Sequence, residues 1–211
     1  NYIITGGLGF VGTNLIKKIL ENKSNKIINF DYYSYASNKY YLKDSKNYKL
    51  IKINLAKNNS IPKVKKIVKF FKPKYFIHLA ADTHVDRSIK STSKFLENNI
   101  HSTINILDVL KDIKKKIKLI YVGTDEVYGD LGKSKKKFNS SSSMDPKNPY
   151  SASKASAINF IKAYGNTFGV SYIIVNPSNL YGSFQYPEKL IPKNIILFLR
   201  KKKIAALWIR K

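Results

Sequence analysis

A tyrosine and a lysine with helical spacing are the first residues in this sequence that could move protons. Tyr150 and Lys154 are four positions apart, so on a helix both side chains would project from one face. A nearby ammonium stabilises tyrosinate and lowers the pKa of a phenol, which would let Tyr150 take a proton from a substrate hydroxyl. The spacing alone also fits two solvent-facing side chains on a helix surface.

A hydroxyl and two carboxylates follow one another in the run Thr124, Asp125 and Glu126, just after an apolar segment that ends at Val122. Paired carboxylates can supply one acid and one base when their environments separate their pKa values. In an open parallel sheet, ligands bind outside the carboxyl ends of the strands, so this run would lie beside a bound ligand. The alternative is a polar turn whose carboxylates face solvent.

A glycine-rich segment follows the first apolar run of the chain. Gly7-Leu8-Gly9-Phe10-Val11-Gly12 lies between the apolar run Tyr2 to Thr5 and a segment with helical periodicity. In this context the glycines permit a tight turn, a close approach of the backbone to a pyrophosphate, and close helix packing. The segment therefore predicts a dinucleotide site at the N-terminus of a helix.

An acidic residue ends the second apolar run at Asp31, 19 positions after Gly12. A carboxylate at this point of a dinucleotide fold accepts hydrogen bonds from the adenosine ribose hydroxyls. A 2'-phosphate would be repelled by it, and no arginine lies nearby in the sequence. We therefore expect NAD as the cofactor in preference to NADP.

The elements that must position these residues alternate along the chain. Apolar runs typical of buried strands are separated by segments with helical spacing, and helices of this length require right-handed crossovers between parallel strands. The fold class predicted is α/β, a doubly wound parallel sheet of the Rossmann type that is covered on both faces. We expect strands at Tyr2 to Thr5, Lys26 to Phe30, Tyr48 to Leu55, Tyr75 to Leu79, Ile117 to Val122 and Val170 to Val175, and helices after Gly9, from Pro62 to Pro73, from Phe95 to Leu110, from Ser151 to Phe168 and after Ile195.

The composition limits the class of protein. The 211 residues carry 39 basic and 13 acidic side chains, a formal net charge of +26, and no cysteine. All but three of the basic residues are lysine and they are spread along the chain, whereas nucleic-acid interfaces favour arginine for bidentate contacts. We therefore expect no nucleic-acid partner, no membrane span and no metal, but attraction to anionic substrates.

Five motifs together resemble the extended short-chain dehydrogenase/reductases, and among them the nucleotide-sugar 4,6-dehydratases, over about residues 2 to 200. The Thr-Asp-Glu run distinguishes these dehydratases from the epimerases of the same superfamily, which are similar at the glycine loop and the Tyr-Lys pair. The motifs are Thr5-Gly6-Gly7-Leu8-Gly9-Phe10-Val11-Gly12, Leu79-Ala80-Ala81-Asp82-Thr83-His84-Val85-Asp86, Gly123-Thr124-Asp125-Glu126-Val127-Tyr128-Gly129, Asn148-Pro149-Tyr150-Ser151-Ala152-Ser153-Lys154 and Pro187-Glu188-Lys189-Leu190-Ile191-Pro192.

The resemblance implies a role for each catalytic residue. Tyr150 would remove the C4 hydroxyl proton of a nucleotide-diphosphate hexose, dTDP-glucose in the most similar members, while hydride passes to NAD, assisted by Lys154 and Thr124. Glu126 would then take the C5 proton, Asp125 would protonate the departing C6 hydroxyl, and hydride would return to C6. The expected product is the 4-keto-6-deoxy sugar.

The resemblance also implies binding positions. His84 belongs to the same loop as Thr83 and is either a positioning residue or a structural one. Cofactor contacts are expected at Gly6, Gly9, Phe10, Val11, Gly12, Asp31, Asn54, Leu55, Leu79, Ala80, Ala81, Asn98, Tyr150 and Lys154, and substrate contacts at Thr83, Thr124, Asn179, Lys189 and Leu190.

For the organisation of the chain, the resemblance implies that residues 1–180 form the NAD-binding domain and that 181–211 begin a small substrate domain that is largely missing. A cytoplasmic homodimer is expected, in which the helices after Tyr150 and from Phe95 pack against their symmetry mates through Ile158, Ile161 and Phe168. Alternatives left open are a UDP-glucose 4,6-dehydratase, a nucleotide-sugar 4-epimerase and an inactive NAD-binding fragment.

Overall fold

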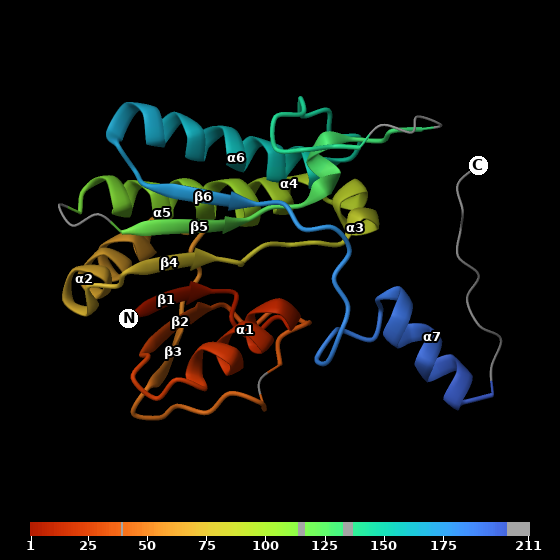
Figure 1. Cartoon of the computed structure of the whole chain (residues 1–211), viewed down its shortest axis with the longest axis horizontal. Helices are drawn as coiled ribbons and strands as arrows, with labels where there is room; N and C mark the ends of the chain where they lie inside the picture. Colours follow the sequence, from red (N-terminus) through yellow and green to blue (C-terminus); the bar gives the residue numbers. More distant parts are fainter. Residues whose placement is uncertain (39, 114–116, 133–136, 202–211) are drawn as a thin grey trace.

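The computed structural model describes residues 1–38, 40–113, 117–132 and 137–201 and contains one six-stranded parallel sheet (Figure 1). The strand order is β3-β2-β1-β4-β5-β6, an order found in doubly wound sheets, which is the fold class that the sequence predicted. The strands are β1 (Tyr2–Thr5), β2 (Ile27–Asp31), β3 (Tyr48–Lys52), β4 (Tyr75–His78), β5 (Lys118–Val122) and β6 (Tyr172–Val175).

Helices lie on both faces of this sheet. The helix α1 packs through Ile16 on one face, and α2, α5 and α6 cover the other. The α-helices are α1 (Phe10–Leu20), α2 (Ile61–Phe71), α3 (Val85–Lys90), α4 (Thr92–Phe95), α5 (Ser102–Lys111), α6 (Pro149–Phe168) and α7 (Leu190–Leu199), with short 3₁₀-helices η1 (Asn58–Ser60) and η3 (Asp125–Tyr128) and a π-helical turn η2 (Leu96–His101).

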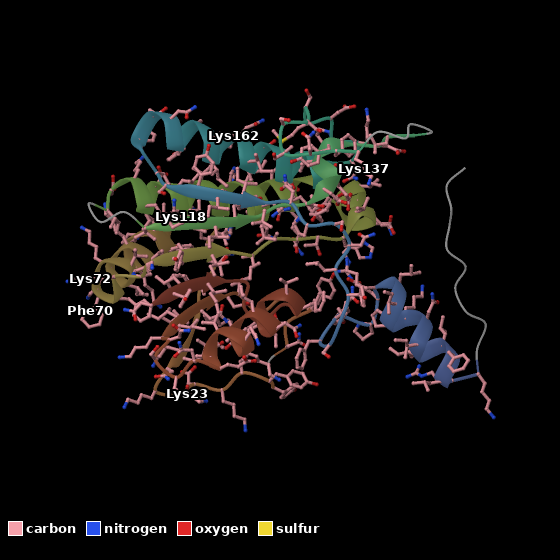
Figure 2. The ribbon with its side chains drawn as sticks, viewed as in Figure 1. Lys23, Phe70, Lys72, Lys118, Lys137 and Lys162 are labelled. Carbon is pink, nitrogen blue, oxygen red and sulfur yellow. The ribbon has the colours of Figure 1, made fainter. Side chains whose placement is uncertain are left out.

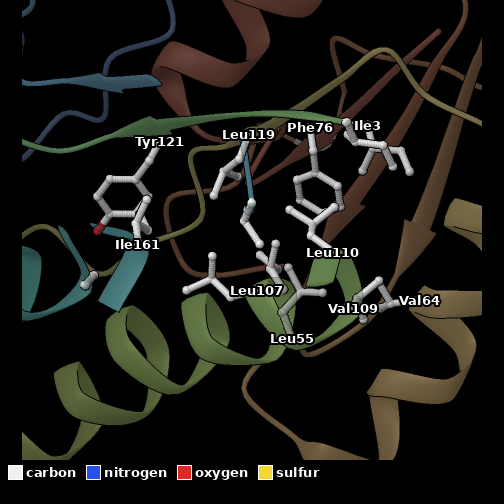
Figure 3. Packing of buried hydrophobic residues seen from close by; sticks show 14 of the residues in the cluster. Ile3, Leu55, Val64, Phe76, Leu107, Val109, Leu110, Leu119, Tyr121 and Ile161 are labelled. Atoms are coloured by element: carbon white, nitrogen blue, oxygen red, sulfur yellow. The ribbon is translucent and has the colours of Figure 1, made fainter. Parts of the chain in front are cut away.

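The larger core lies between the sheet and α2, α5 and α6. Figure 3 shows Phe76 and Leu119 of the central strands facing Leu107 and Leu110 of α5. These four side chains are buried, and burying apolar surface of this kind is the main favourable term in folding. The central strands are therefore a rigid base for the loops at their carboxyl ends.

The start of α6 is specified by its sequence. The Asn148 side chain accepts a hydrogen bond from the Ser151 N–H, and the Ser151 hydroxyl receives one from the Asn148 N–H, which forms a reciprocal capping box. Pro149 occupies the first turn, where its missing N–H costs no intrahelical bond, and Gly169 ends the helix at a left-handed φ of 69°. This cap places Tyr150 in the first turn of α6.

Three elements differ most from those expected. The strand β3 ends at Lys52, because Asn54 turns the chain by accepting the Ala56 N–H on its side-chain oxygen. The helix predicted from Phe95 to Leu110 is interrupted by the π-helical turn η2, and α7 begins at Leu190 rather than after Ile195. Pro192 lies in the first turn of α7, where proline is tolerated.

The last described part of the chain is less covered than the rest. On β6, Ile173 and Val175 are 47% and 43% exposed, so the expectation of a sheet covered on both faces is wrong at this edge. The helix α7 lies away from the sheet in Figure 1 and buries none of its residues. None of the helices that the structure describes combines the length and apolarity needed to cross a membrane. Residues 202–211 of the expected substrate region lie outside the described part.

Candidate active site

A cleft of about 450 Å³ lies at the carboxyl ends of the strands. It brings together nearly all of the residues that the sequence predicted, from loops that follow every strand of the sheet. Asp125 and Leu190 do not line it. The predicted residues in its lining are Gly6, Gly9, Phe10, Val11, Gly12, Asp31, Asn54, Leu55, Leu79, Ala80, Ala81, Thr83, Asn98, Thr124, Glu126, Tyr150, Lys154, Asn179 and Lys189.

The glycine loop has little room for side chains. Gly6 has a φ of 67°, and a Cβ there would lie 2.7 Å from the backbone of Ala80. A Cβ on Gly12 would lie 2.5 Å from the Cα of Gly7, so α1 packs directly on the loop. No side chain caps the N-terminus of α1 at Gly9. The first-turn N–H groups of a helix have no intrahelical partners and can bind an anion.

Asp31 is held in place at the edge of this loop. Its Oδ2 accepts a hydrogen bond from the Leu8 N–H at 3.0 Å, and its Oδ1 accepts one from the Tyr33 N–H at 3.0 Å. Only 8% of Asp31 is exposed, and it lines the cleft. The carboxylate is therefore oriented by the backbone, with remaining acceptor positions for the hydroxyls of a ligand.

Two neighbouring asparagines organise the loop after β4 from the π-helical turn η2. Asn98 donates a hydrogen bond to the Asp82 carboxylate at 2.7 Å. The buried Asn99 accepts the Asp82 N–H at 2.8 Å and donates to the Asp82 carbonyl at 3.0 Å and to Ser153 of α6 at 2.9 Å. Asn98 was predicted, whereas Asn99 was missed because its role depends on contacts with Asp82 and Ser153 that periodicity does not reveal. Such π-turns are frequent at functional sites.

Tyr150 and Lys154 lie in the interior end of the cleft. The Lys154 ammonium donates a hydrogen bond to the Val122 carbonyl at 2.7 Å and lies over the Tyr121 ring. Burial lowers the pKa of Lys154 to about 7. Burial and the Glu126 charge raise the pKa of Tyr150 to about 12, although a hydrogen bond with Thr124 opposes them. The expected lowering of the Tyr150 pKa is therefore wrong, because burial and the negative charge of Glu126 raise it.

The Thr-Asp-Glu run separates its two carboxylates. Thr124 accepts the Glu126 N–H at 3.3 Å and caps the turn η3, which begins at Asp125. The Glu126 carboxylate lines the cleft beside Tyr150 and accepts a hydrogen bond from Asn148 at 3.2 Å. Asp125 lies outside the lining, where its carboxylate accepts the Thr124 hydroxyl at 3.4 Å. The two acids thus occupy different environments.

A polar cluster at the cleft mouth was not predicted as a unit. Glu188 accepts hydrogen bonds from the Tyr35 hydroxyl at 2.6 Å and from Arg87 at 3.3 Å, and the Arg87 guanidinium stacks over the Tyr35 ring. His84 lies 3.9 Å from the same carboxylate. These contacts tie the segment before α7 to α3 and to the loop after β2. In the described part of the chain, no group of three His, Asp or Glu side chains is placed to hold a metal ion.

The comparison with family models identifies the chain over almost its whole length. Residues 2–208 match the NAD dependent epimerase/dehydratase family. A dTDP-glucose 4,6-dehydratase of Haemophilus influenzae is 38% identical over 203 residues, which cover 91% of this chain and 59% of that protein. A dTDP-D-glucose 4,6-dehydratase of Dictyostelium discoideum is 42% identical over 95% of this chain and 48% of its own length. The chain spans about half to three fifths of these relatives.

Solved structures show the same relationship. A crystal structure of dTDP-glucose 4,6-dehydratase from Bacillus anthracis in complex with NAD superposes with a TM-score of 0.86 at 35% identity, over 97% of this chain and 63% of that one. A UDP-glucuronic acid 4-epimerase from Bacillus cereus reaches the same TM-score at 24% identity and shares the fold. The family model matches residues 2–208, and the cleft contains the glycine loop and the Tyr150–Lys154 pair. The chain therefore belongs to the NAD dependent epimerase/dehydratase family.

Proposed function

We propose that the chain carries the NAD-binding and catalytic part of a nucleotide-sugar 4,6-dehydratase, with dTDP-glucose as substrate. The observation that carries the proposal is the placement of Glu126 beside Tyr150 in the cleft that also holds the glycine loop. A glycine loop and a tyrosine would serve any member of the family, whereas elimination also needs a base for the C5 proton. The relatives described as dTDP-glucose 4,6-dehydratases support this reading.

The residues of the cleft fit NAD. The uncapped N-terminus of α1 suits a pyrophosphate, and the Asp31 carboxylate at the end of β2 suits the ribose hydroxyls of adenosine. Asn54 and Leu55 line the part of the cleft after β3, and Ala80 lines the part after β4. The relative from Bacillus anthracis was crystallised with NAD. The chemistry that bound NAD supplies is hydride acceptance and return.

For the oxidation step, Tyr150 is the base that takes the C4 hydroxyl proton. The Thr124 hydroxyl lies close to the phenol and opposes the rise in its pKa. Lys154 is fixed by the Val122 carbonyl beneath the cleft, where an ammonium stabilises a phenolate. Oxidation gives a 4-keto sugar, whose ketone acidifies the C5 hydrogen.

For the elimination step, the two carboxylates divide the work. Glu126 takes the C5 proton, and Asn148 holds its carboxylate through a hydrogen bond at 3.2 Å. Asp125 protonates the C6 hydroxyl as it leaves as water. Because Asp125 does not line the cleft, this role requires the substrate to reach Asp125 at the start of the η3 turn.

The substrate side is proposed to use Thr83, Asn179 and Lys189, which line the cleft, with Leu190 beginning α7 beside them. The Lys189 ammonium suits a diphosphate. We propose residues 1–180 as the NAD-binding domain and 181–211 as the start of the substrate-binding region. The chain spans about three fifths of the Haemophilus relative, so we propose, for this chain alone, that it has the activity.

The test is an incubation of the protein with dTDP-glucose and NAD, followed by alkali treatment and absorbance measurement of a 4-keto-6-deoxy sugar. Formation of this product at a rate that depends on Glu126 supports the proposal. A C4 epimer with no keto product would identify a 4-epimerase instead. Binding of NAD without turnover of dTDP-glucose or UDP-glucose would identify an inactive NAD-binding chain.

A cytoplasmic homodimer is proposed as well, through α6 and α5 as first expected but with a different set of α6 residues that retains Phe168. Ile158 and Ile161 are buried against the parent sheet, so their predicted place in the dimer contact is wrong. Phe160 and Phe168 of α6 are 40% and 51% exposed and offer an apolar contact beside α5. Light scattering at micromolar concentration tests the dimer, since a monomer would contradict it, and cell fractionation tests the location.

A further inference from the structure

A buried histidine without a role in the proposed chemistry lies at the centre of the sheet. His78 ends β4 and is 1% exposed. Its Nδ1 lies 2.6 Å from the Thr5 hydroxyl at the end of β1, and its Nε2 lies 3.1 Å from the Thr103 hydroxyl of α5. Thr5 and Thr103 are also fully buried. Burial lowers the pKa of His78 to about 3, so the ring is neutral and carries one proton.

The hydrogen bonds around the ring decide which nitrogen carries this proton. The Thr5 oxygen accepts the N–H groups of Leu79 at 3.2 Å and of Ala80 at 3.1 Å, so its own hydrogen points to His78. The Thr103 hydroxyl donates to the Asn99 carbonyl at 2.7 Å, so its oxygen faces His78 as an acceptor. A hydroxyl has one hydrogen and two lone pairs. The two threonine hydroxyls therefore require His78 to accept a hydrogen bond at Nδ1 and to donate one from Nε2.

The Thr5 hydroxyl connects this ring to the cofactor side of the cleft. The loop Leu79 to Ala81 lines the cleft, and the Ala80 N–H bond to Thr5 holds it against the glycine turn. The contact is close, because a Cβ on Gly6 would lie 2.7 Å from the Cα of Ala80. Rotation of the Thr5 hydroxyl would break the hydrogen bonds that it accepts from the Leu79 and Ala80 N–H groups.

The Thr103 end leads to the catalytic helix. Asn99, whose carbonyl accepts the Thr103 hydroxyl, also donates a hydrogen bond to Ser153, and Ser153 donates to the Tyr150 carbonyl at 2.7 Å. The same asparagine holds the backbone of Asp82. One continuous set of buried hydrogen bonds thus joins the ends of β1 and β4 to the start of α6.

We propose that His78 is a positioning residue, fixed as the neutral Nε2–H tautomer, which orients the Thr5 hydroxyl and thereby holds the Leu79–Ala81 loop against the glycine turn for cofactor binding. The proposal rests on the NAD site proposed above. The network is buried and all its donors are used. Removing one side chain therefore leaves its hydrogen-bonding neighbour in the network with an unsatisfied polar group.

The tautomer is tested in the unaltered protein by a two-bond proton–nitrogen correlation spectrum of the histidine rings. The expected result is protonation of the His78 ring at Nε2 only, unchanged between pH 5 and pH 8, two values on either side of the usual histidine pKa of about 6.5. A ring protonated at Nδ1, or at both nitrogens, would overturn the assignment. This measurement needs no cofactor.

The positioning role is tested by calorimetric NAD titration of four variants, one of which is a control. Thr5→Val and His78→Phe should bind NAD roughly tenfold more weakly than the parent, which corresponds to one lost hydrogen bond, and the Ala80 amide should exchange its hydrogen faster. Thr5→Ser keeps the hydroxyl and should restore both values. Phe76→Leu is the matched control, because Phe76 lies two residues before His78 on the same face of β4 and is buried without a polar group.

The outcomes separate the two proposals. If the parent protein binds no NAD, the proposed cofactor site is wrong. The Nε2–H tautomer of His78 is still tested independently by the proton–nitrogen spectrum. If the parent binds NAD and Thr5→Val binds it equally well with unchanged exchange at Ala80, the positioning role is overturned. Equal weakening in Phe76→Leu would mean that loss of stability alone explains the effect, which also overturns it.

Discussion

Two parts of the same cleft are held together in different ways. The cofactor side, made by the loops after β1, β2 and β4, is fixed from inside by buried groups such as Asp31, His78 and Asn99. The substrate side, made by the segment between β6 and α7, is fixed from outside by Glu188 and its partners Tyr35 and Arg87. The helix α7 buries no residue, and Phe198 is 68% exposed.

The difference indicates how much each side depends on the rest of the protein. Breaking one of a set of satisfied buried hydrogen bonds costs about 1 to 3 kcal/mol, whereas exposed ion pairs contribute about 0 to 1 kcal/mol. We therefore expect the cofactor side to be formed before NAD binds. The position of the substrate segment should respond to ligands and to solution conditions.

The largest effect is expected from Gly9→Val. The Cβ of valine would approach only the Gly6 carbonyl, at 3.2 Å, so the chain should still fold. The rest of the side chain would occupy the space where a pyrophosphate approaches the loop, and NAD binding should be lost. Calorimetry checks the binding, and a circular dichroism melt checks the fold. Retained NAD affinity in a folded Gly9→Val protein would mean that the cofactor does not use this loop.

Variants of the two catalytic residues should block different steps of the reaction. Tyr150→Phe should block the first oxidation, and Glu126→Gln should permit oxidation but stop elimination, each by roughly 10² to 10⁴-fold in its own step. Single-turnover absorbance of NADH and solvent deuterium exchange at C5 distinguish them. Parent-rate exchange at C5 in Glu126→Gln would show that another residue is the base, and normal NADH accumulation in Tyr150→Phe would remove Tyr150 from the oxidation.

Lys154 should make stability depend on pH. Because burial lowers its pKa from 10.5 to about 7, the unfolded chain binds more protons than the folded chain between these values. The free energy of unfolding should therefore rise with pH across this window, by on the order of a few kcal/mol. Lys154→Met should remove this contribution, while Lys162→Met should keep it, because Lys162 is exposed on α6 (Figure 2). Denaturant melts at several pH values measure the difference, and identical pH profiles for the parent and Lys154→Met would contradict the buried amine.

The smallest effect is expected from Glu188→Gln. Losing the carboxylate weakens the contacts with Tyr35 and Arg87, so the segment before α7 should be cleaved a few-fold faster by a protease, in keeping with about 1 kcal/mol of lost interaction. NAD affinity should stay within about twofold of the parent value. Glu21→Gln removes an exposed ion pair on α1 and serves as the control. A large loss of NAD affinity in Glu188→Gln would mean that the two sides are coupled.

The sequence predicted those parts of the site that depend on local signals. The glycine loop and Asp31 were predicted from residues near them in the sequence, the Tyr150–Lys154 pair was predicted from its helical spacing, and the strands that carry them follow from apolar runs. The network around His78 was not predicted, because Thr5 and His78 are 73 positions apart and meet only when β1 pairs with β4.

Two further features needed the structure for the same reason. The π-turn that directs both Asn98 and Asn99 toward Asp82 has no signature in a helical pattern of apolar residues. The lowered pKa of Lys154 and the raised pKa of Tyr150 follow from burial, which spacing on a helix does not report. Sequence spacing indicated which residues meet, whereas the electrostatics depended on how deeply they are buried.

A pair of calorimetric titrations with NAD and with NADP shows whether the cofactor side is complete and selective in this chain. We expect saturable binding of NAD and much weaker binding of NADP, because a 2'-phosphate would meet the carboxylate of Asp31, which the backbone of Leu8 and Tyr33 holds at the cleft edge. Absence of NAD binding would contradict a complete cofactor side, and NADP binding as tight as that of NAD would contradict selection by Asp31.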